Sequence, residues 1–167
     1  MNDFVTDLAW SFEIADDQSL DAFYRKTFPH LERIEKVQDL ALQRRGIDKI
    51  LHMKSGKSYF VDEKKRRTAY PDILIEEYSD FDRRRVGWIG KDKYTDYLVY
   101  AIMPTQTVYL FPFLLLQLAW LRNYSQWLAR YGRKFAANKG YRTSNIAVPG
   151  GALIDAIRWE MCQTEAV

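Results

Sequence analysis

Several short runs along the chain, some alternating hydrophobic and polar residues and some continuously apolar or aromatic, are typical of β-strands. The runs lie at residues 47–53, 58–64, 72–78, 97–102, 107–110 and 144–148. The first two flank a short turn that contains Gly56, so they predict an antiparallel hairpin. Residues 31–40 have apolar side chains at a spacing of three and also alternate over 33–37, so either a helical turn or an edge strand fits them.

Helical patterns occur at three other places in the chain. A short helix is expected to end near Phe28, because Pro29 follows it. A long helix is expected over 113–131, with Pro112 at its start, and a closing helix over 152–161. Together with the strands, this order predicts an α+β or mixed α/β fold, with a central mixed sheet flanked by helices.

The length of 167 residues fits a single domain over 1–167, and a hydrophobic fraction of 47% is enough for a core. The most apolar stretch, 108–121, is shorter than the roughly 20 residues that a membrane span needs. The first residues, 1–4, lack the basic and apolar regions of a signal peptide. We therefore expect a cytoplasmic protein with no membrane partner.

The formal net charge of +3 hides an uneven distribution of charge along the chain. Residues 1–42 are acidic, whereas 43–96 are basic, and 97–154 contain six basic residues and no carboxylate. A basic surface of this kind suits a polyanionic partner such as nucleic acid. The single cysteine, Cys162, excludes a disulfide framework, and two histidines make a multi-histidine metal site improbable. Any bound metal is therefore expected to have oxygen ligands.

The predicted hairpin carries the residues with the clearest chemical potential. Asp62 and Lys64 project from the same face of the second strand, because side chains alternate along a strand. The register of the hairpin could bring Asp48 beside Asp62. Two carboxylates suit Mg²⁺ or Mn²⁺, and the backbone carbonyl of Glu63 is a further candidate ligand. Lys64 could orient an attacking water or neutralise charge on a phosphate.

The segments Gly46-Ile47-Asp48-Lys49 and Val61-Asp62-Glu63-Lys64 resemble the PD-(D/E)XK nuclease superfamily, most closely its bacterial and prophage members. The resemblance implies a restriction-endonuclease-like fold and a Mg²⁺-dependent endonuclease that hydrolyses DNA phosphodiester bonds. It also implies that Asp48 and Asp62 are metal ligands and that Lys64 is the catalytic lysine.

This sequence departs from the superfamily pattern at one position and permits a second alignment. Ile47 stands where proline is common, and a rival register would place the side chains of Glu63 and Lys65 in the site. Gln43 and Glu76 are supporting candidates, the latter if its strand pairs beside the hairpin. Glu32 or Glu35 could supply the helix-borne acidic ligand that parts of the superfamily have, although a solvent-facing helical position fits each of them better.

Basic residues that could contact nucleic-acid phosphates need only positive charge and reach. The candidates are Arg44, Arg45, Lys65, Arg66, Arg67, Arg83, Arg84, Arg85, Arg133, Lys134, Lys139 and Arg142. DNA is the expected substrate and RNA a second candidate. One site per chain would favour a homodimer for cutting both strands of a duplex.

Two other functions fit the sequence. The first is a nucleic-acid-binding protein that keeps the nuclease fold without its chemistry. The second is a protein-interaction module that uses the aromatic helix over 113–131 and the acidic N-terminal region.

Overall fold

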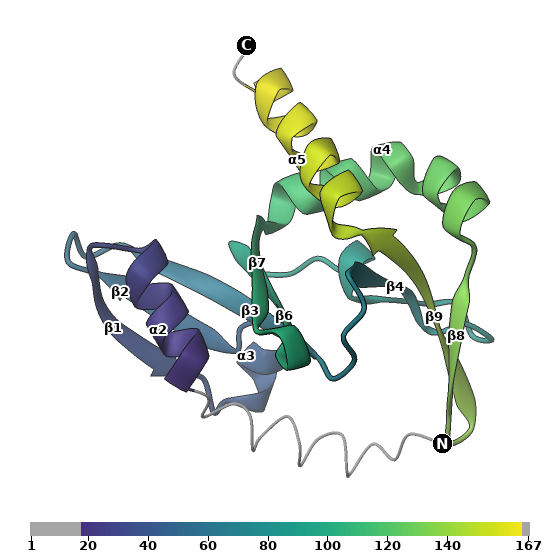
Figure 1. Ribbon diagram of the computed structural model, residues 1–167. Coiled ribbons are helices and arrows are strands. Elements are labelled where there is room, and N and C mark those ends of the chain that lie inside the picture. The colour runs from purple at the N-terminus through teal and green to yellow at the C-terminus, as the bar shows by residue number, and fades with distance from the viewer. Residues whose placement is uncertain (1–17, 165–167) are drawn as a thin grey trace. The chain divides into compact units, whose positions relative to one another are not determined.

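The computed structural model describes residues 18–164 and has an α+β fold (Figure 1). These residues form two compact units. Residues 18–68 and 92–110 form the hairpin unit, and residues 69–91 and 111–164 form the helical unit. The single domain expected over 1–167 stays a prediction. Residues 1–17, which include the first four residues and the start of the acidic N-terminal region, lie outside the described residues.

The hairpin unit contains a five-stranded mixed sheet in the order β1-β2-β3-β6-β7. The strands are β1 (Leu31–Lys36), β2 (Lys49–Met53), β3 (Ser58–Arg66), β6 (Tyr97–Ile102) and β7 (Thr107–Pro112). The predicted hairpin is present as the antiparallel pair β2–β3, and β3 also pairs with β6 in parallel. The segment of ambiguous pattern at 31–40 contains an edge strand, β1, rather than one helix.

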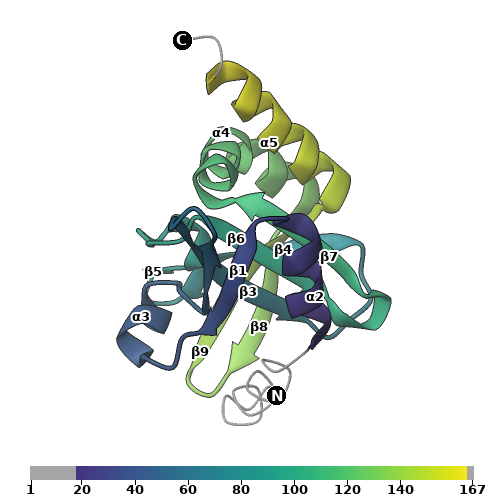
Figure 2. The same ribbon diagram turned by 90° about the vertical axis from the view of Figure 1, so that its left-hand side faces the viewer.

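Helix α2 (Gln18–Thr27) covers one face of this sheet (Figure 2). Leu20 and Tyr24 are buried in one apolar cluster with Leu51, Val61 and Val99 from three adjacent strands. Burial of this apolar surface stabilises the unit and fixes the face of β3 that lies under the helix. Two short helices, α3 (Leu40–Arg44) and the 3₁₀ helix η2 (Met103–Thr105), complete the unit.

The helical unit contains a four-stranded antiparallel sheet in the order β5-β4-β9-β8. The strands are β4 (Asp72–Asp80), β5 (Arg85–Val86), β8 (Lys134–Asn138) and β9 (Tyr141–Pro149), and the 3₁₀ helix η1 (Trp88–Gly90) follows β5. This second sheet was not predicted. β8 replaces the basic loop that the sequence suggested over 132–140, because it pairs with β9 along its length.

Helices α4 (Phe113–Tyr131) and α5 (Gly150–Thr164) pack against each other and against β9. Both match the predicted helices within a few residues. The aromatic residues Trp120, Tyr124, Trp127 and Tyr131 form a stripe along one face of α4, and the two tryptophans of this stripe are buried in the core. Among residues 18–164, no helix combines the length and the apolarity that a membrane crossing requires.

Candidate active site

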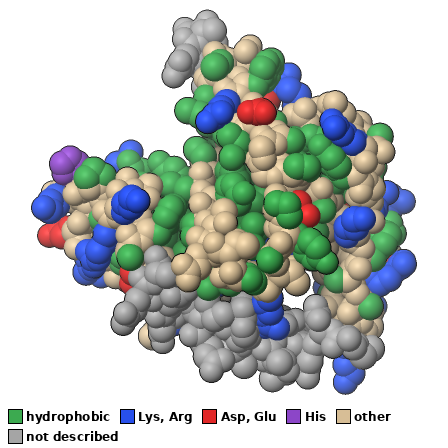
Figure 3. All heavy atoms as spheres, viewed as in Figure 1, with side chains coloured by type: hydrophobic (Ala, Val, Ile, Leu, Met, Phe, Trp, Pro, Cys, Tyr) green, Lys and Arg blue, Asp and Glu red, His purple; other side chains and the backbone are tan. Residues whose placement is uncertain are grey.

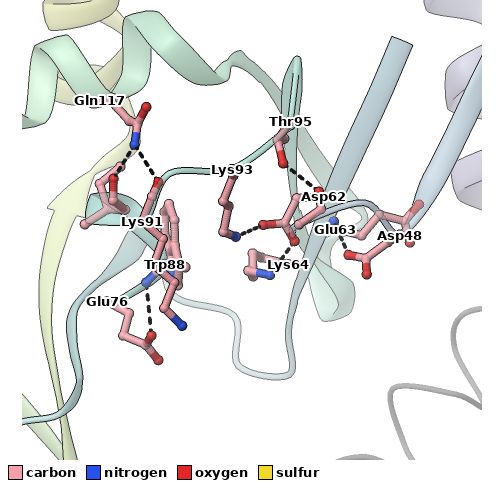
Figure 4. Close-up of polar contacts among 12 residues, drawn as sticks. Asp48, Asp62, Glu63, Lys64, Glu76, Trp88, Lys91, Lys93, Thr95 and Gln117 are labelled. Atoms are coloured by element: carbon pink, nitrogen blue, oxygen red, sulfur yellow. Dashed lines mark hydrogen bonds and ion pairs between the residues drawn. The ribbon is translucent and has the colours of Figure 1, made fainter. Parts of the chain in front are cut away.

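The backbone of the hairpin brings Asp48 next to Asp62. The Asp48 N–H donates to the Val61 carbonyl at 2.8 Å, which extends the β2–β3 ladder beyond the start of β2. The Asp48 carboxylate in turn accepts a hydrogen bond from the Glu63 N–H, also at 2.8 Å (Figure 4). Asp48 is therefore bonded to the residues on both sides of Asp62, and its orientation is fixed by main-chain atoms.

Asp62 is a buried carboxylate between two ammonium groups. Its side chain accepts from Lys64 at one oxygen and from Lys93 at the other (Figure 4). Burial alone would raise the pKa of Asp62, but the charges and hydrogen bonds of Lys64 and Lys93 outweigh it and hold the pKa below its ordinary value. Asp62 is therefore ionised at neutral pH.

Asp48 has the opposite electrostatic environment. Burial, the negative charge of Asp62 and a hydrogen bond with Asp62 raise the pKa of Asp48 from 3.8 to about 6, against the opposing effect of Lys64. The carboxylates of Asp48 and Asp62 repel each other when both are ionised, and this repulsion contributes to the raised pKa of Asp48. A divalent cation at this position would relieve that repulsion, so the pair has the chemistry of a cation site.

Lys93 was not identified from the sequence. It lies in the polar connection before β6, and its side chain is 6% exposed. Burial and the neighbouring charge of Lys64 lower its pKa, although Asp62 opposes this. No local pattern distinguishes it from Lys91 two residues earlier, because its role depends on a contact with Asp62 across 31 residues.

Gly46 leaves room for the stem of Lys93. It has φ +80°, and a Cβ there would lie 2.7 Å from the Lys93 Cδ and from the Thr95 Oγ1. The Thr95 hydroxyl donates to the Gly46 carbonyl at 2.6 Å, which holds the two segments together. Gly46, in the segment that resembles the nuclease superfamily, therefore positions Lys93 as well as the turn before Asp48.

The rival pair, Glu63 and Lys65, lies on the face of β3 that α2 covers. The Tyr24 hydroxyl donates to the Glu63 carboxylate at 2.7 Å. Lys49 and Lys65 also approach this carboxylate, at 3.4 and 3.2 Å. These four side chains form a largely buried charged cluster on the opposite face from Asp62 and Lys64, as strand alternation requires.

The supporting candidates lie in different surroundings. Gln43 is half-buried on α3, and its amide donates to the Val37 carbonyl at 2.8 Å, so it connects α3 to the segment that follows β1. Glu76 lies on β4, in the helical unit, where its carboxylate accepts from the Trp88 N–H at 3.1 Å. Its strand does not pair beside the hairpin, the arrangement on which its selection depended.

No helix carries the two candidates for a helix-borne acidic ligand. Glu32 and Glu35 both lie on the edge strand β1. Glu35 contacts Arg33 at 2.8 Å and His52 at 3.0 Å, and hydrogen bonds from His52 and Arg33 lower its pKa. The expectation of a helix-borne ligand from either residue is therefore wrong.

Several basic residues proposed for phosphate binding are engaged in ion pairs. Arg83 pairs with Asp80, Arg133 with Glu77 and Arg142 with Asp82. Lys65 pairs with Glu63, Arg66 donates to Thr68, and Arg45 lies over the ring of Tyr94. Arg44 and Arg67 are exposed. In residues 18–164, no carboxylate pairs with the side chains of Arg84, Lys134 or Lys139, whereas hydrogen bonds from Arg83 and, to a smaller extent, the charge of Arg85 lower the pKa of Asp80.

The donor set suits Mg²⁺ better than a metal with many protein ligands. Within the described part of the chain, no group of three or more acidic, His or Cys side chains is arranged to hold a metal. Mg²⁺ often binds to one or two carboxylates and takes its other ligands from water and substrate phosphate. Asp48 and Asp62 fit that requirement.

The sequence matches no protein-family model, and no curated protein matches it. Among solved structures, the chain is similar to a nuclease from a fusselovirus, with 10% sequence identity and a TM-score of 0.37 over 98% of each chain. A similarity at this TM-score does not establish a shared fold. The candidate function therefore depends on the side chains described above.

Proposed function

We propose that the protein is a metal-dependent nuclease that hydrolyses phosphodiester bonds in DNA. The observation that carries this proposal is the adjacency of Asp48 and Asp62, with Lys64 on the same side. Ionised carboxylates next to a lysine can hold a hard cation and place a positive charge near a phosphate. The resemblance of the segments around Asp48 and Asp62 to PD-(D/E)XK nucleases supports the same chemistry.

Asp48 and Asp62 would hold Mg²⁺ or Mn²⁺, together with the backbone carbonyl of Glu63. The bound ion would supply Lewis-acid activation of water and of a phosphate oxygen. Asp62 would enter the reaction ionised, because its pKa is already low. Lys64, whose side chain is 32% exposed, can reach solvent and would orient the attacking water or neutralise the phosphate.

Lys93 would act as a positioning residue. Its ammonium group holds the Asp62 oxygen that Lys64 does not contact, and its burial keeps it in place. The site therefore holds its ligand carboxylate in one orientation without a metal. Cation binding would redistribute the contacts that Lys64 and Lys93 make with Asp62.

The test is cleavage of supercoiled plasmid and of labelled oligonucleotides with Mg²⁺, with Mn²⁺ and with EDTA. We expect nicking only with a divalent cation. Asp62→Asn and Lys64→Ala should lower the cleavage rate by at least about a hundredfold. Asp92→Asn is the matched control, because Asp92 is exposed near Lys93 and outside the proposed site. Full metal-dependent cleavage by folded Asp62→Asn would overturn the proposal.

The second candidate is a nucleic-acid-binding protein that has this site without its chemistry. The occupation of both Asp62 oxygens by ammonium groups favours it, because lysines already supply the positive charge. It predicts salt-dependent DNA binding and no cleavage with any divalent metal. Cleavage that requires Asp48 and Asp62 would exclude it.

DNA is the proposed substrate, and RNA oligonucleotides of the same sequence belong in the same assay. Residues 18–164 carry one candidate site, so double-strand cleavage would favour a homodimer. Light scattering of the protein with duplex DNA would measure that state directly.

A further inference from the structure

We propose that the helical unit contains a stacking site for one unpaired nucleobase, formed by Phe135 and Phe81. This inference rests on the proposed nucleic-acid substrate and specifies the form of that substrate. It concerns a surface made only of residues from the helical unit. The chemical class of the ligand is single-stranded DNA, or a DNA end or fork with unpaired bases.

Aromatic rings are gathered beside the β8–β9 pair. The rings of Phe81 and Phe135 meet edge to face, with centroids 5.0 Å apart, and Tyr78 meets Phe81 in the same way at 5.8 Å. Phe135 is 50% exposed, although its side chain is large and apolar. A ring that is supported by other rings and open to solvent is suited to receive a planar partner.

Guanidinium groups surround these rings. Arg142 lies over Phe135 at 5.2 Å and over Phe81 at 5.6 Å, and Arg133 lies over Phe81 at 5.6 Å. Arg142 and Arg133 are held by carboxylates, Asp82 and Glu77, in two-point hydrogen bonds. Their planar groups are therefore fixed beside the rings and add cation–π and stacking surface rather than net charge.

The net positive charge beside the rings comes from Arg84. It is exposed at the turn before β5 in a left-handed conformation with φ 51°, and it pairs with no carboxylate of residues 18–164. Lys134 is also exposed on β8, but its side chain projects from the opposite face to that of Phe135, because side chains alternate along a strand. Figure 3 shows Lys and Arg side chains along the side of the molecule where Figure 1 draws β8 and β9. Phosphates next to a stacked base would meet these charges.

A cavity opens beside Phe81, and Phe135 does not line it. It has a volume of about 440 Å³, and Tyr78, Phe81, Asp82, Arg84 and Arg133 line it. Ligand pockets in proteins usually measure about 300–1,000 Å³. The aromatic rings that line the cavity can contact the face of a base, and its fixed hydrogen-bond donors and acceptors can contact the base edge. Arg84, which has no carboxylate partner, can contact the phosphate.

Stacking determines which nucleic acid fits. A base inside a duplex has both faces covered by its neighbours, so Phe135 can stack only on a base at an end, in a loop or in a single strand. The site therefore predicts tighter binding to single-stranded or forked DNA than to a closed duplex of equal charge.

The test is fluorescence anisotropy in EDTA, where cleavage by a metal-dependent nuclease does not occur. The probes are a labelled single-stranded oligonucleotide and a hairpin duplex with the same number of phosphates. Phe135→Ala should weaken single-strand binding about tenfold and duplex binding by less than about twofold. Phe135→Trp should restore binding, because it keeps a stacking ring. Leu114→Ala, which removes an exposed apolar side chain on α4, should bind like wild type.

The salt dependence separates the ring from the charges. Phe135→Ala should leave the slope of log affinity against log salt unchanged, whereas Arg84→Gln should reduce it by about 0.7. Equal single-strand binding by wild type and folded Phe135→Ala would overturn the stacking site. That result would leave cleavage through Asp62 untouched. Conversely, Phe135-dependent binding by a protein that cleaves nothing would retain this site and remove the nuclease proposal.

Discussion

The ammonium group of Lys93 pairs with the carboxylate of Asp62 although 31 residues separate them in the sequence. This contact ties the connection before β6 to β3, the strand that carries Asp62 and Lys64. Because both side chains are almost completely buried, water cannot replace either partner at low cost. The candidate site thus contains a buried ion pair that connects two segments distant in the sequence.

Removal of Lys93 should weaken the metal-free protein and strengthen cation binding. Lys93→Met leaves buried Asp62 with one ammonium partner, so the free energy of unfolding in EDTA should fall by about 1–3 kcal/mol. It also removes a positive charge that competes with Mg²⁺. Urea unfolding with and without Mg²⁺ measures both effects. Lys91→Met, at an exposed position nearby, is the control. An unchanged stability in EDTA would contradict the role of Lys93.

The pKa of Asp48 predicts a pH dependence of stability. Its value is about 6 in the folded protein and 3.8 ordinarily, so the folded state holds a proton that the unfolded state has lost between these values. Protonated Asp48 therefore contributes to the free energy of unfolding below pH 3.8, and this contribution is lost as the pH rises through 6. Asp48→Asn should therefore gain about 1–3 kcal/mol relative to wild type on going from pH 4 to pH 7.5.

Urea unfolding in EDTA at several pH values tests this prediction for Asp48. Asparagine can still accept the hydrogen bond from the Glu63 N–H, so the comparison isolates the charge. Asp92→Asn should differ from wild type by a constant amount. A pH-independent difference for Asp48→Asn would show that burial and the charge of Asp62 do not raise the pKa of Asp48.

Asp62 and Glu63 lie on opposite faces of β3, so we expect their substitution to have different effects on cleavage and on stability. Glu63 lies in the buried cluster with Lys49, Lys65 and Tyr24, so Glu63→Gln should lower the free energy of unfolding by about 2–4 kcal/mol. The fraction that stays folded at low temperature should cleave DNA within about twofold of wild type. A stable but inactive Glu63→Gln variant would mean that Glu63 and Lys65 form the active pair.

Local alternation was enough to predict the hairpin and the shared face of Asp62 and Lys64, whereas the position of Asp48 beside Asp62 depended on the register of the hairpin, which the sequence left open. The strands that flank the turn are adjacent in sequence, so their pairing depends on a short loop. The α+β class and the limits of α4 could also be predicted, because a long aromatic stripe has a clear helical period.

The remaining features depend on contacts between distant segments. β4 had a clear strand pattern, but only its pairing with β9 assigns it to a second sheet. β8 has a weak pattern, KFAAN, and becomes a strand because β9 lies beside it. The position of Lys93 in the site could not be predicted either, because its partner Asp62 is 31 residues away in the sequence. Ion pairs also changed the interpretation of Arg133 and Arg142, whose partners lie on other elements.

The distinction between paired and unpaired cations predicts how basic residues divide between stability and DNA binding. Glu77 is buried, and burial alone would raise its pKa, but hydrogen bonds from Arg133, Tyr124 and Ser144 lower it. Arg133→Ala removes the guanidinium group that donates to both oxygens of the Glu77 carboxylate. We expect a loss of about 2–4 kcal/mol in the free energy of unfolding.

Lys134 provides the contrasting case one residue later. Lys134→Ala should leave the free energy of unfolding within about 0.5 kcal/mol of wild type, because the side chain is exposed and pairs with no carboxylate of residues 18–164. It should weaken DNA binding and reduce the salt slope by about 0.7–0.9. Arg133→Ala should leave that slope nearly unchanged, since Glu77 already neutralises Arg133. Urea unfolding and anisotropy at several salt concentrations measure both properties, and a larger salt effect for Arg133→Ala than for Lys134→Ala would reverse the assignment.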